Sequence, residues 1–145
     1  RIPMITYPIT FTAKAKTAEG IQTPWQTESQ NLELVCAIPT EFEGPGKAWS
    51  PEDLFAMALT NCFLATFKVY AEKSKLKFEA VTAEAKLIVD YDSNKKPVMK
   101  SFKLIANISG TENPERTRTI ANRAFSSGFI LNSVKTELQM DLQVT

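Results

Sequence analysis

The feature that most constrains the fold of this chain is an uncharged segment from Leu54 to Phe67. Its large apolar side chains, at helical spacing, point to nearly every side of the axis: Leu54, Phe55, Met57, Leu59, Phe63, Leu64 and Phe67. A helix that is apolar all round is buried all round. The segment is shorter than the roughly 20 residues that span a bilayer, and charges flank it, which argues against a membrane span. We expect a buried central helix that a second protomer helps to cover.

The four residues from Ser50 to Asp53 mark the start of this helix. Ser50 suits the cap position, Pro51 suits the first turn, and the Asp53 carboxylate completes a capping box. The helix is predicted to extend to about Ser74. Before it, prolines and glycines predict a loop from Pro39 to Trp49.

Alternating apolar and polar side chains predict strands on both sides of the helix. They are expected at Thr6–Lys16, Gln22–Thr27 and Leu32–Ile38 before it, and at Phe78–Asp92, Val98–Ser109 and residues 138–144 after it. A second helix is predicted to begin at Asn113 and to end at Gly128, with Ile120, Ala121, Ala124 and Phe125 on its apolar face. The order of elements is three strands, a helix, two strands, a second helix and a last strand. This order predicts one α+β domain over residues 1–145, with an antiparallel sheet around the buried central helix.

Composition excludes several classes of function. The chain has no histidine, so Ser-His-Asp triads, Cys-His pairs and imidazole catalysis are excluded. Its two cysteines, Cys36 and Cys62, form no CxxC motif, and neither a metal site, a cofactor nor a disulfide scaffold is expected. Seventeen basic and sixteen acidic side chains leave a net charge of +1, which predicts neither a nucleic-acid partner nor a membrane partner.

Free cysteines fit a reducing compartment, and the cytoplasm is the expected location. No secretory signal is visible at the start of the chain. Met4 suits a natural first residue, and we therefore interpret Arg1-Ile2-Pro3 as an addition to the native chain.

The segment Ser50–Ala56, followed by Ala58–Phe63, resembles the OsmC/Ohr family, small dimeric thiol peroxidases that reduce organic hydroperoxides. Cys62 falls ten residues after Glu52, like the peroxidatic cysteine of the family. The resemblance implies an OsmC-like fold, an intertwined homodimer, and catalytic roles for Cys62 as nucleophile and Glu52 as organiser.

Two further segments are similar to family segments: the loop Pro39–Gly44, and Phe129–Val134 after the second helix. The chain departs from the family at two positions. Gly128 stands where the family usually has a second cysteine, and Ile21 lies at or near the position of an arginine that many members carry. The candidates to replace that cation are Lys14, Lys16, Arg116, Arg118 and Arg123.

A peroxidatic cysteine must be a thiolate beside positive or hydrogen-donating groups, and it becomes a sulfenic acid. Each residue also has a purely structural alternative. A lone cysteine in an apolar helix can simply pack in the core, and the negative charge of Glu52 is favourable at the positive end of the helix dipole. Ten helical residues separate Glu52 from Cys62 by about 15 Å, so a joint role requires the Glu52 of a second protomer or a mediating cation. Cys36 would resolve the sulfenic acid only with its Cα within about 7 Å of that of Cys62.

Two functions are consistent with the sequence. The first is a thiol-dependent peroxidase with a one-cysteine cycle, in which an external thiol reduces the sulfenic acid. The second is a dimer that binds an apolar ligand without turnover, as the missing arginine and thiol would suggest. Five aromatic residues are candidates to line an apolar pocket for an organic hydroperoxide. The alternative is that they belong to the core. They are Trp25, Trp49, Phe55, Phe63 and Phe129.

Overall fold

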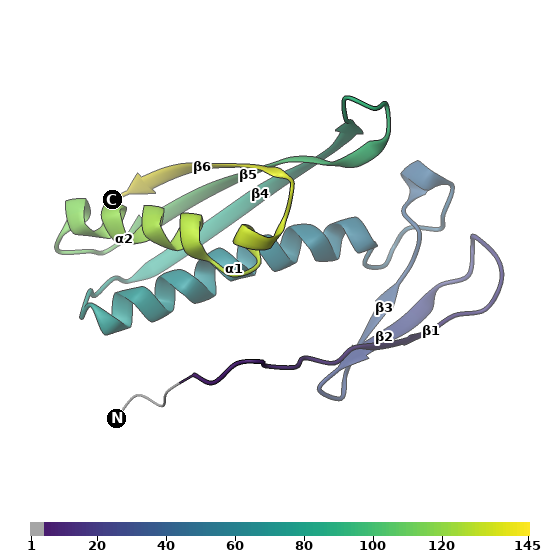
Figure 1. The fold of residues 1–145 in the computed structure, drawn as a ribbon, viewed down its shortest axis with the longest axis horizontal. Coiled ribbons are helices and arrows are strands. Elements are labelled where there is room, and N and C mark those ends of the chain that lie inside the picture. Colours follow the sequence, from purple (N-terminus) through teal and green to yellow (C-terminus); the bar gives the residue numbers. More distant parts are fainter. Residues whose placement is uncertain (1–4) are drawn as a thin grey trace. The chain divides into compact units, whose positions relative to one another are not determined.

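The computed structural model describes residues 5–145. Met4 and the three residues before it, which we interpreted as an addition, lie outside this range. The chain divides into two compact units, one ending at Asp53 and the other extending from Leu54 to Thr145. Figure 1 shows the helices and strands of both.

The first unit contains an antiparallel sheet of three strands in the order β1 (Lys14–Lys16), β2 (Trp25–Ser29) and β3 (Leu32–Cys36). A short 3-10 helix, η1 (Thr40–Phe42), follows. Gln30 and Asn31 join β2 to β3 with φ values of 55° and 62°. Two consecutive positive φ angles are what a tight two-residue hairpin turn requires.

The first strand is much shorter than predicted, because it needs a neighbour that the chain does not supply. Lys14 pairs with Glu28, and β2 ends one residue later at Ser29. Residues before Ala13 therefore have no further β2 residues to pair with, although the predicted strand began at Thr6. Ile9 is 51% exposed and Phe11 is 86% exposed. The alternating apolar side chains of this segment are therefore uncovered in the single chain.

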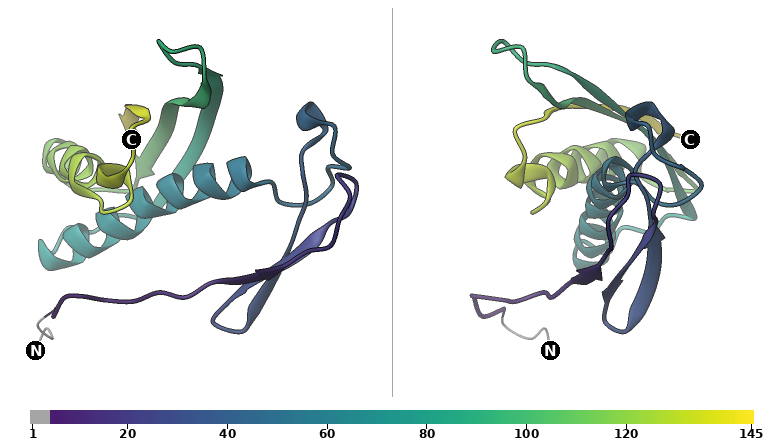
Figure 2. Two further views of the ribbon diagram at one scale, coloured as in Figure 1. Left: turned by 45° about the vertical axis from the view of Figure 1, so that its right-hand side comes forward. Right: turned by 90° about the vertical axis from the view of Figure 1, so that its right-hand side faces the viewer.

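The second unit is built from α1 (Pro51–Lys73), which begins in the first unit, β4 (Ala80–Tyr91), β5 (Pro97–Ser109), α2 (Pro114–Ser127), the 3-10 helix η2 (Leu131–Ser133) and β6 (Glu137–Val144). The strands form one sheet in the order β4-β5-β6. Both helices lie on the same face of this sheet (Figures 1 and 2). The α+β class and the order of elements are confirmed.

The prediction of a purely antiparallel sheet is wrong at the last strand. β4 and β5 form the expected antiparallel hairpin, but β6 runs parallel to β5, from the pair Ser101–Glu137 to the pair Ile108–Val144. A parallel pair requires a crossover connection, because a tight turn always reverses the chain direction. Here α2 and η2 are that crossover.

The core of the second unit lies between the helices and the sheet. Alternate residues of β5 are fully or almost fully buried: Phe102, Leu104, Ala106 and Ile108. One side of α1 meets them with Leu59, Phe63, Phe67 and Ala71, and α2 adds Ile120, Ala121 and Ala124. Three of the four residues predicted for the apolar face of α2 are therefore buried, and the fourth, Phe125, is half-buried.

Only one side of α1 is buried in the single chain, and the expected burial of its other sides would require a second protomer. Its exposed side carries small or apolar residues at helical spacing: Met57, Ala58, Asn61, Ala65 and Val69. By length and composition α1 could cross a membrane, with a mean hydropathy of 1.4. A core helix of a soluble protein passes the same test, and the packing of its other side against β5 is of that kind.

Replacing Phe67 with alanine is expected to lower the free energy of unfolding by about 3–5 kcal/mol, the usual cost of removing a buried phenylalanine. Its side chain is 0% exposed, and its ring lies 6.1 Å from that of Phe63 and 5.2 Å from that of Phe78. Urea denaturation measures the change. Phe129→Ala, at a site that is 70% exposed, is the matched control. Equal losses for the two variants would contradict this core.

Candidate thiol site

The helix that carries the predicted site begins with the capping box read from the sequence. The Ser50 N–H donates to Asp53 Oδ2 at 3.0 Å, and the Asp53 N–H donates to Ser50 Oγ at 2.9 Å. These reciprocal bonds satisfy two amides at the start of α1. Pro51 is the first helical residue, as predicted. The box fixes where the helix starts and therefore where Glu52 and Cys62 lie along it.

Cys62 lies on α1 and is a free, half-buried thiol. It packs against the buried core cluster of the second unit. Its Sγ lies 4.0 Å from the hydroxyl oxygen of Thr66, one turn further along. The thiol is thus neither fully enclosed nor disulfide-bonded, and a hydroxyl is its neighbour on the helix.

Gly128, at the end of α2, lies directly against the sulfur of Cys62. A Cβ built on Gly128 would be 2.8 Å from Cys62 Sγ, and 3.2 Å from both the Ala124 carbonyl oxygen and Leu131 Cδ1. The backbone there has φ −57° and ψ 139°, which any L-residue adopts. Space beside the thiol, and not backbone conformation, is therefore what the glycine provides at this position.

The backbone on both sides of Gly128 is held by hydrogen bonds. The Gly128 N–H donates to the Ala124 carbonyl at 3.0 Å, and the Gly128 carbonyl accepts from the Asn132 N–H at 2.8 Å. In the same turn, the Ser133 hydroxyl donates to the Phe129 carbonyl at 2.6 Å. The peptide that faces the thiol is therefore part of a well-ordered turn between α2 and η2.

Glu52 lies in the first turn of α1, on the same helix as Cys62 but about 15 Å from it along the axis, at 1.5 Å per residue. The two therefore do not meet within one helix. One carboxylate oxygen of Glu52, Oε1, is buried and has no hydrogen-bond partner among residues 5–145. A buried carboxylate oxygen without a partner is energetically costly, so this oxygen is an unusual feature of the site.

The three arginines proposed as replacement cations contact other groups. Arg116 donates to the Ser74 carbonyl. Arg118 donates to the Leu142 carbonyl at 3.4 Å, and the Arg123 guanidinium lies 4.8 Å from the centre of the Tyr70 ring. Tyr70 is eight residues beyond Cys62, about 12 Å along α1. Each arginine is thus engaged away from the thiol.

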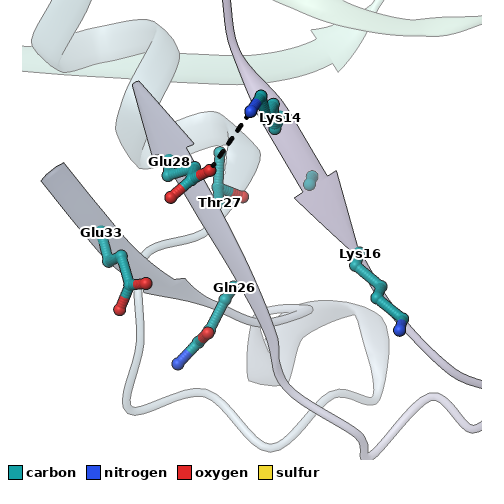
Figure 3. A pocket seen from close by; sticks show the side chains of 7 residues that line it. Lys14, Lys16, Gln26, Thr27, Glu28 and Glu33 are labelled. Atoms are coloured by element: carbon teal, nitrogen blue, oxygen red, sulfur yellow. Dashed lines mark ion pairs between the residues drawn. The ribbon is translucent and has the colours of Figure 1, made fainter. Parts of the chain in front are cut away.

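The two candidate lysines, Lys14 and Lys16, lie on β1 in the first unit. They line a surface hollow of about 420 Å³ together with Gln26, Glu28 and Glu33, and Figure 3 shows these side chains. The ammonium of Lys14 is 3.9 Å from the Glu28 carboxylate, and its side chain is 76% exposed. An exposed pair of this kind contributes little stability, and the hollow carries charges of both signs.

Cys36 and the five predicted aromatic residues differ in how deeply they are buried. Cys36 is buried and its thiol donates to the Thr27 hydroxyl at 3.5 Å. Phe63 is fully buried in the core, so it does not line an open pocket. Phe55 is half-buried against the same core. The remaining three are accessible: Trp49 is 44% exposed, Phe129 is 70% exposed, and Trp25 is half-buried.

Sequence reasoning missed a contact between α1 and α2. Tyr70 of α1 bonds to Ser127 of α2, and Arg123, which was considered only as a replacement cation, lies over the Tyr70 ring. The spacing of Cys62, Thr66 and Tyr70 by four residues places them on one side of α1, and this signal was present in the sequence. No local pattern predicts that Tyr70 meets Ser127, which lies on another helix.

The α+β fold of this chain is that of a solved OsmC-like structure. The family model described as OsmC-like protein matches residues 44–143. The chain belongs to this family.

Individual relatives agree with this assignment. YmaD, an uncharacterized protein of Bacillus subtilis (strain 168), is 23% identical over 122 residues, which is 81% of each chain. The OsmC-like protein VCA0330 of Vibrio cholerae, of unknown function, has a similar structure with a TM-score of 0.83 and 21% identity, over 93% of this chain and 99% of that one.

A third structure, with 26% identity and a TM-score of 0.74 over 97% of this chain and 99% of that one, is an organic hydroperoxide resistance protein OsmC of Legionella pneumophila. The family thus includes both proteins named for hydroperoxide resistance and proteins of unknown function.

Proposed function

We propose that this protein is a homodimeric, thiol-dependent peroxidase that reduces organic hydroperoxides, with Cys62 as its nucleophile. The observation that carries the proposal is the free, half-buried thiol of Cys62 on α1 of an OsmC-like chain. The hydroperoxide resistance named for the Legionella protein supports the substrate class. Cytoplasmic oxidative-stress defence is the corresponding biological role.

In the proposed reaction the Cys62 thiolate attacks the terminal oxygen of the hydroperoxide. An S–O bond forms as the O–O bond breaks, and the alkoxide that leaves takes up a proton to become an alcohol. Sulfur is oxidised to a sulfenic acid and the peroxide is reduced. An external thiol then attacks the sulfenic sulfur, which releases water and leaves a mixed disulfide. A second thiol reduces that disulfide and restores Cys62.

A one-cysteine cycle is proposed because Gly128, which lies against the sulfur, carries no thiol. Cys36 is buried and bonded to Thr27 in the first unit. In the proposed cycle the reductant comes from outside the chain, and a small thiol or dithiol is the simplest chemical class.

Glu52 is proposed to act on the Cys62 of the other protomer. Helix geometry separates the two residues by about 15 Å within one chain. The buried, unpartnered Oε1 of Glu52 supports a partner group that a second chain contributes. In this arrangement Glu52 would orient a cation beside the thiolate, and the cation would stabilise the negative charge on sulfur.

The exposed apolar surface supports the homodimer. The exposed side of α1 includes Val69 at 48% exposure, and in the first unit Phe11 is 86% and Leu32 is 72% exposed. Covering such side chains removes apolar area from water, which favours association.

We therefore expect sedimentation to give twice the 16.2 kDa mass of one chain at micromolar concentration. Val69→Arg places a charge on the exposed side of α1 and is expected to shift the protein toward the monomer. Thr82→Arg, on the polar outer face of β4, is the control and should stay dimeric. A wild-type monomer would contradict the homodimer.

The proposed reaction is tested by trapping its intermediate. The reduced protein is treated with one equivalent of cumene hydroperoxide and then with dimedone, a sulfenic-acid probe. Peptide mass spectrometry is expected to find the adduct on Cys62, together with one equivalent of cumyl alcohol. Unmodified Cys62 after excess hydroperoxide would refute the peroxidase.

A second function, binding of an apolar ligand without turnover, is favoured by two observations. Gly128 supplies no second thiol, and each arginine of α2 is engaged elsewhere. This function predicts that a fatty acid binds equally well to the wild type and to Cys62→Ser, measured by calorimetry, while no hydroperoxide is consumed. Rapid thiol-dependent consumption would exclude it.

A further inference from the structure

A hydrogen bond ties the end of α2 to α1 two turns beyond Cys62. The hydroxyl oxygens of Tyr70 and Ser127 lie 2.7 Å apart. The Ser127 hydroxyl also donates to the Arg123 carbonyl at 2.7 Å. A serine hydroxyl has one proton to donate, so in this geometry Ser127 accepts from Tyr70. Tyr70 is therefore the donor, and its phenol binds an oxygen whose own proton is already engaged.

A second residue of α2, Arg123, contacts the ring of the same tyrosine. The Arg123 guanidinium lies 4.8 Å from the centre of the Tyr70 ring, within the range of a cation–π interaction. Tyr70 on α1 thus contacts two residues of the last turns of α2. We refer to Tyr70, Arg123 and Ser127 together as the Tyr70 clasp.

The clasp acts on the residue that faces the thiol. Ser127 directly precedes Gly128, where a Cβ would lie 2.8 Å from Cys62 Sγ. The hydrogen bonds of the Gly128 peptide itself go to Ala124 and Asn132, within the same turn. Those bonds fix the shape of the turn but not its distance from α1. The Tyr70–Ser127 bond is a polar contact between α2 and α1, and it adds to the apolar packing of Phe125 against Phe63, whose ring centres are 6.3 Å apart.

We propose that Tyr70 and Ser127 are positioning residues that hold Gly128 against the Cys62 sulfur. The glycine closes one side of the sulfur, and a reactant approaches from the remaining side. This positioning stands on geometry alone. Its consequence for hydroperoxide reduction, a defined direction of attack on Sγ, rests on the proposed function.

The position of Gly128 is measured with a cysteine reporter. In a Cys36→Ser background, Gly128→Cys leaves one thiol pair, and its disulfide equilibrium in a glutathione buffer gives a reduction potential. Tyr70→Phe and Ser127→Ala are each expected to weaken this disulfide about tenfold, the upper range for a net hydrogen bond. Tenfold corresponds to a rise of about 30 mV in the potential. Arg123→Ala is expected to weaken it about threefold.

Ser126→Ala is the matched control, because the Ser126 hydroxyl also donates to the Arg123 carbonyl, at 3.1 Å, but does not bond to Tyr70. Its potential should be unchanged. Potentials of Tyr70→Phe and Ser127→Ala within twofold of the parent, or an equal shift in Ser126→Ala, would overturn the proposal. Arg123→Ala removes an exposed side chain and keeps the test available if either hydroxyl variant fails to fold.

The reporter separates this proposal from the proposed function, because the glutathione equilibrium involves no hydroperoxide. Shifted potentials in a protein that consumes no cumene hydroperoxide would sustain the clasp and refute the peroxidase. Unchanged potentials in an active enzyme would refute the clasp alone.

Discussion

Replacing Cys62 with serine is expected to lower the thiol-dependent reduction of cumene hydroperoxide by at least about a hundredfold. A serine hydroxyl is not ionised at neutral pH and cannot become a sulfenic acid, so the proposed cycle has no first step. The rate is measured as hydroperoxide consumed with dithiothreitol as reductant. Because the substitution replaces one sulfur with one oxygen in a half-buried site, circular dichroism should show an unchanged fold.

Cys36→Ser is the matched control for this experiment. Cys36 is buried and its thiol bonds to Thr27, and a serine hydroxyl can make the same bond. We expect this variant to retain the wild-type rate within about twofold, since the proposed cycle makes no use of Cys36. Equal activity of Cys62→Ser and the wild type would place the chemistry elsewhere. A large loss in Cys36→Ser alone would show that the second thiol resolves the first.

Replacing Gly128 with cysteine is expected to create a disulfide with Cys62. The Cβ would lie 2.8 Å from Cys62 Sγ, and in a disulfide the corresponding separation is about 3 Å, given an S–S bond of about 2.05 Å. Closing a loop of roughly 66 residues predicts about 4 kcal/mol of stabilisation in the chain-entropy model, less any strain. Strain is expected from the Ala124 carbonyl and Leu131, each 3.2 Å from the new Cβ.

Mass spectrometry after mild oxidation should show that Gly128→Cys has lost two hydrogen atoms, whose electrons go to the oxidant. Urea denaturation with and without reductant should give the stabilisation. Phe129→Cys is the control, because position 129 is next in sequence but 70% exposed. A disulfide in the control and none in Gly128→Cys would mean that α2 ends elsewhere relative to the thiol.

Local sequence signals predicted the starts of both helices well, because their causes are local. The capping box of Ser50 and Asp53 and the Asn113 cap, which accepts from the Arg116 N–H at 3.1 Å, involve residues three apart. The alternation between Phe78 and Asp92 likewise predicted a strand close to the observed range of β4, Ala80–Tyr91. Such features need no knowledge of the rest of the fold.

Features that depend on distant neighbours could not be predicted in this way. The short β1 reflects the length of β2, and the parallel direction of β6 reflects the path of α2. At the site, the resemblance indicated that Gly128 replaces a thiol, but only the structure shows the glycine against the sulfur. Tyr70 and Ser127 lie 57 residues apart, and no pattern connects them.

The parallel direction of β6 has a consequence for the order in which the second unit folds. β4 and β5 are joined by a short turn and can pair early, since a hairpin closes a small loop. β6 can pair with β5 only after the chain has been brought back by α2, which makes this a slow, non-local step. Until then, the free edge of β5 and the apolar face that ends at Ile108 stay open to pairing with other chains. Pairing of β6 is therefore the step that closes this edge of β5.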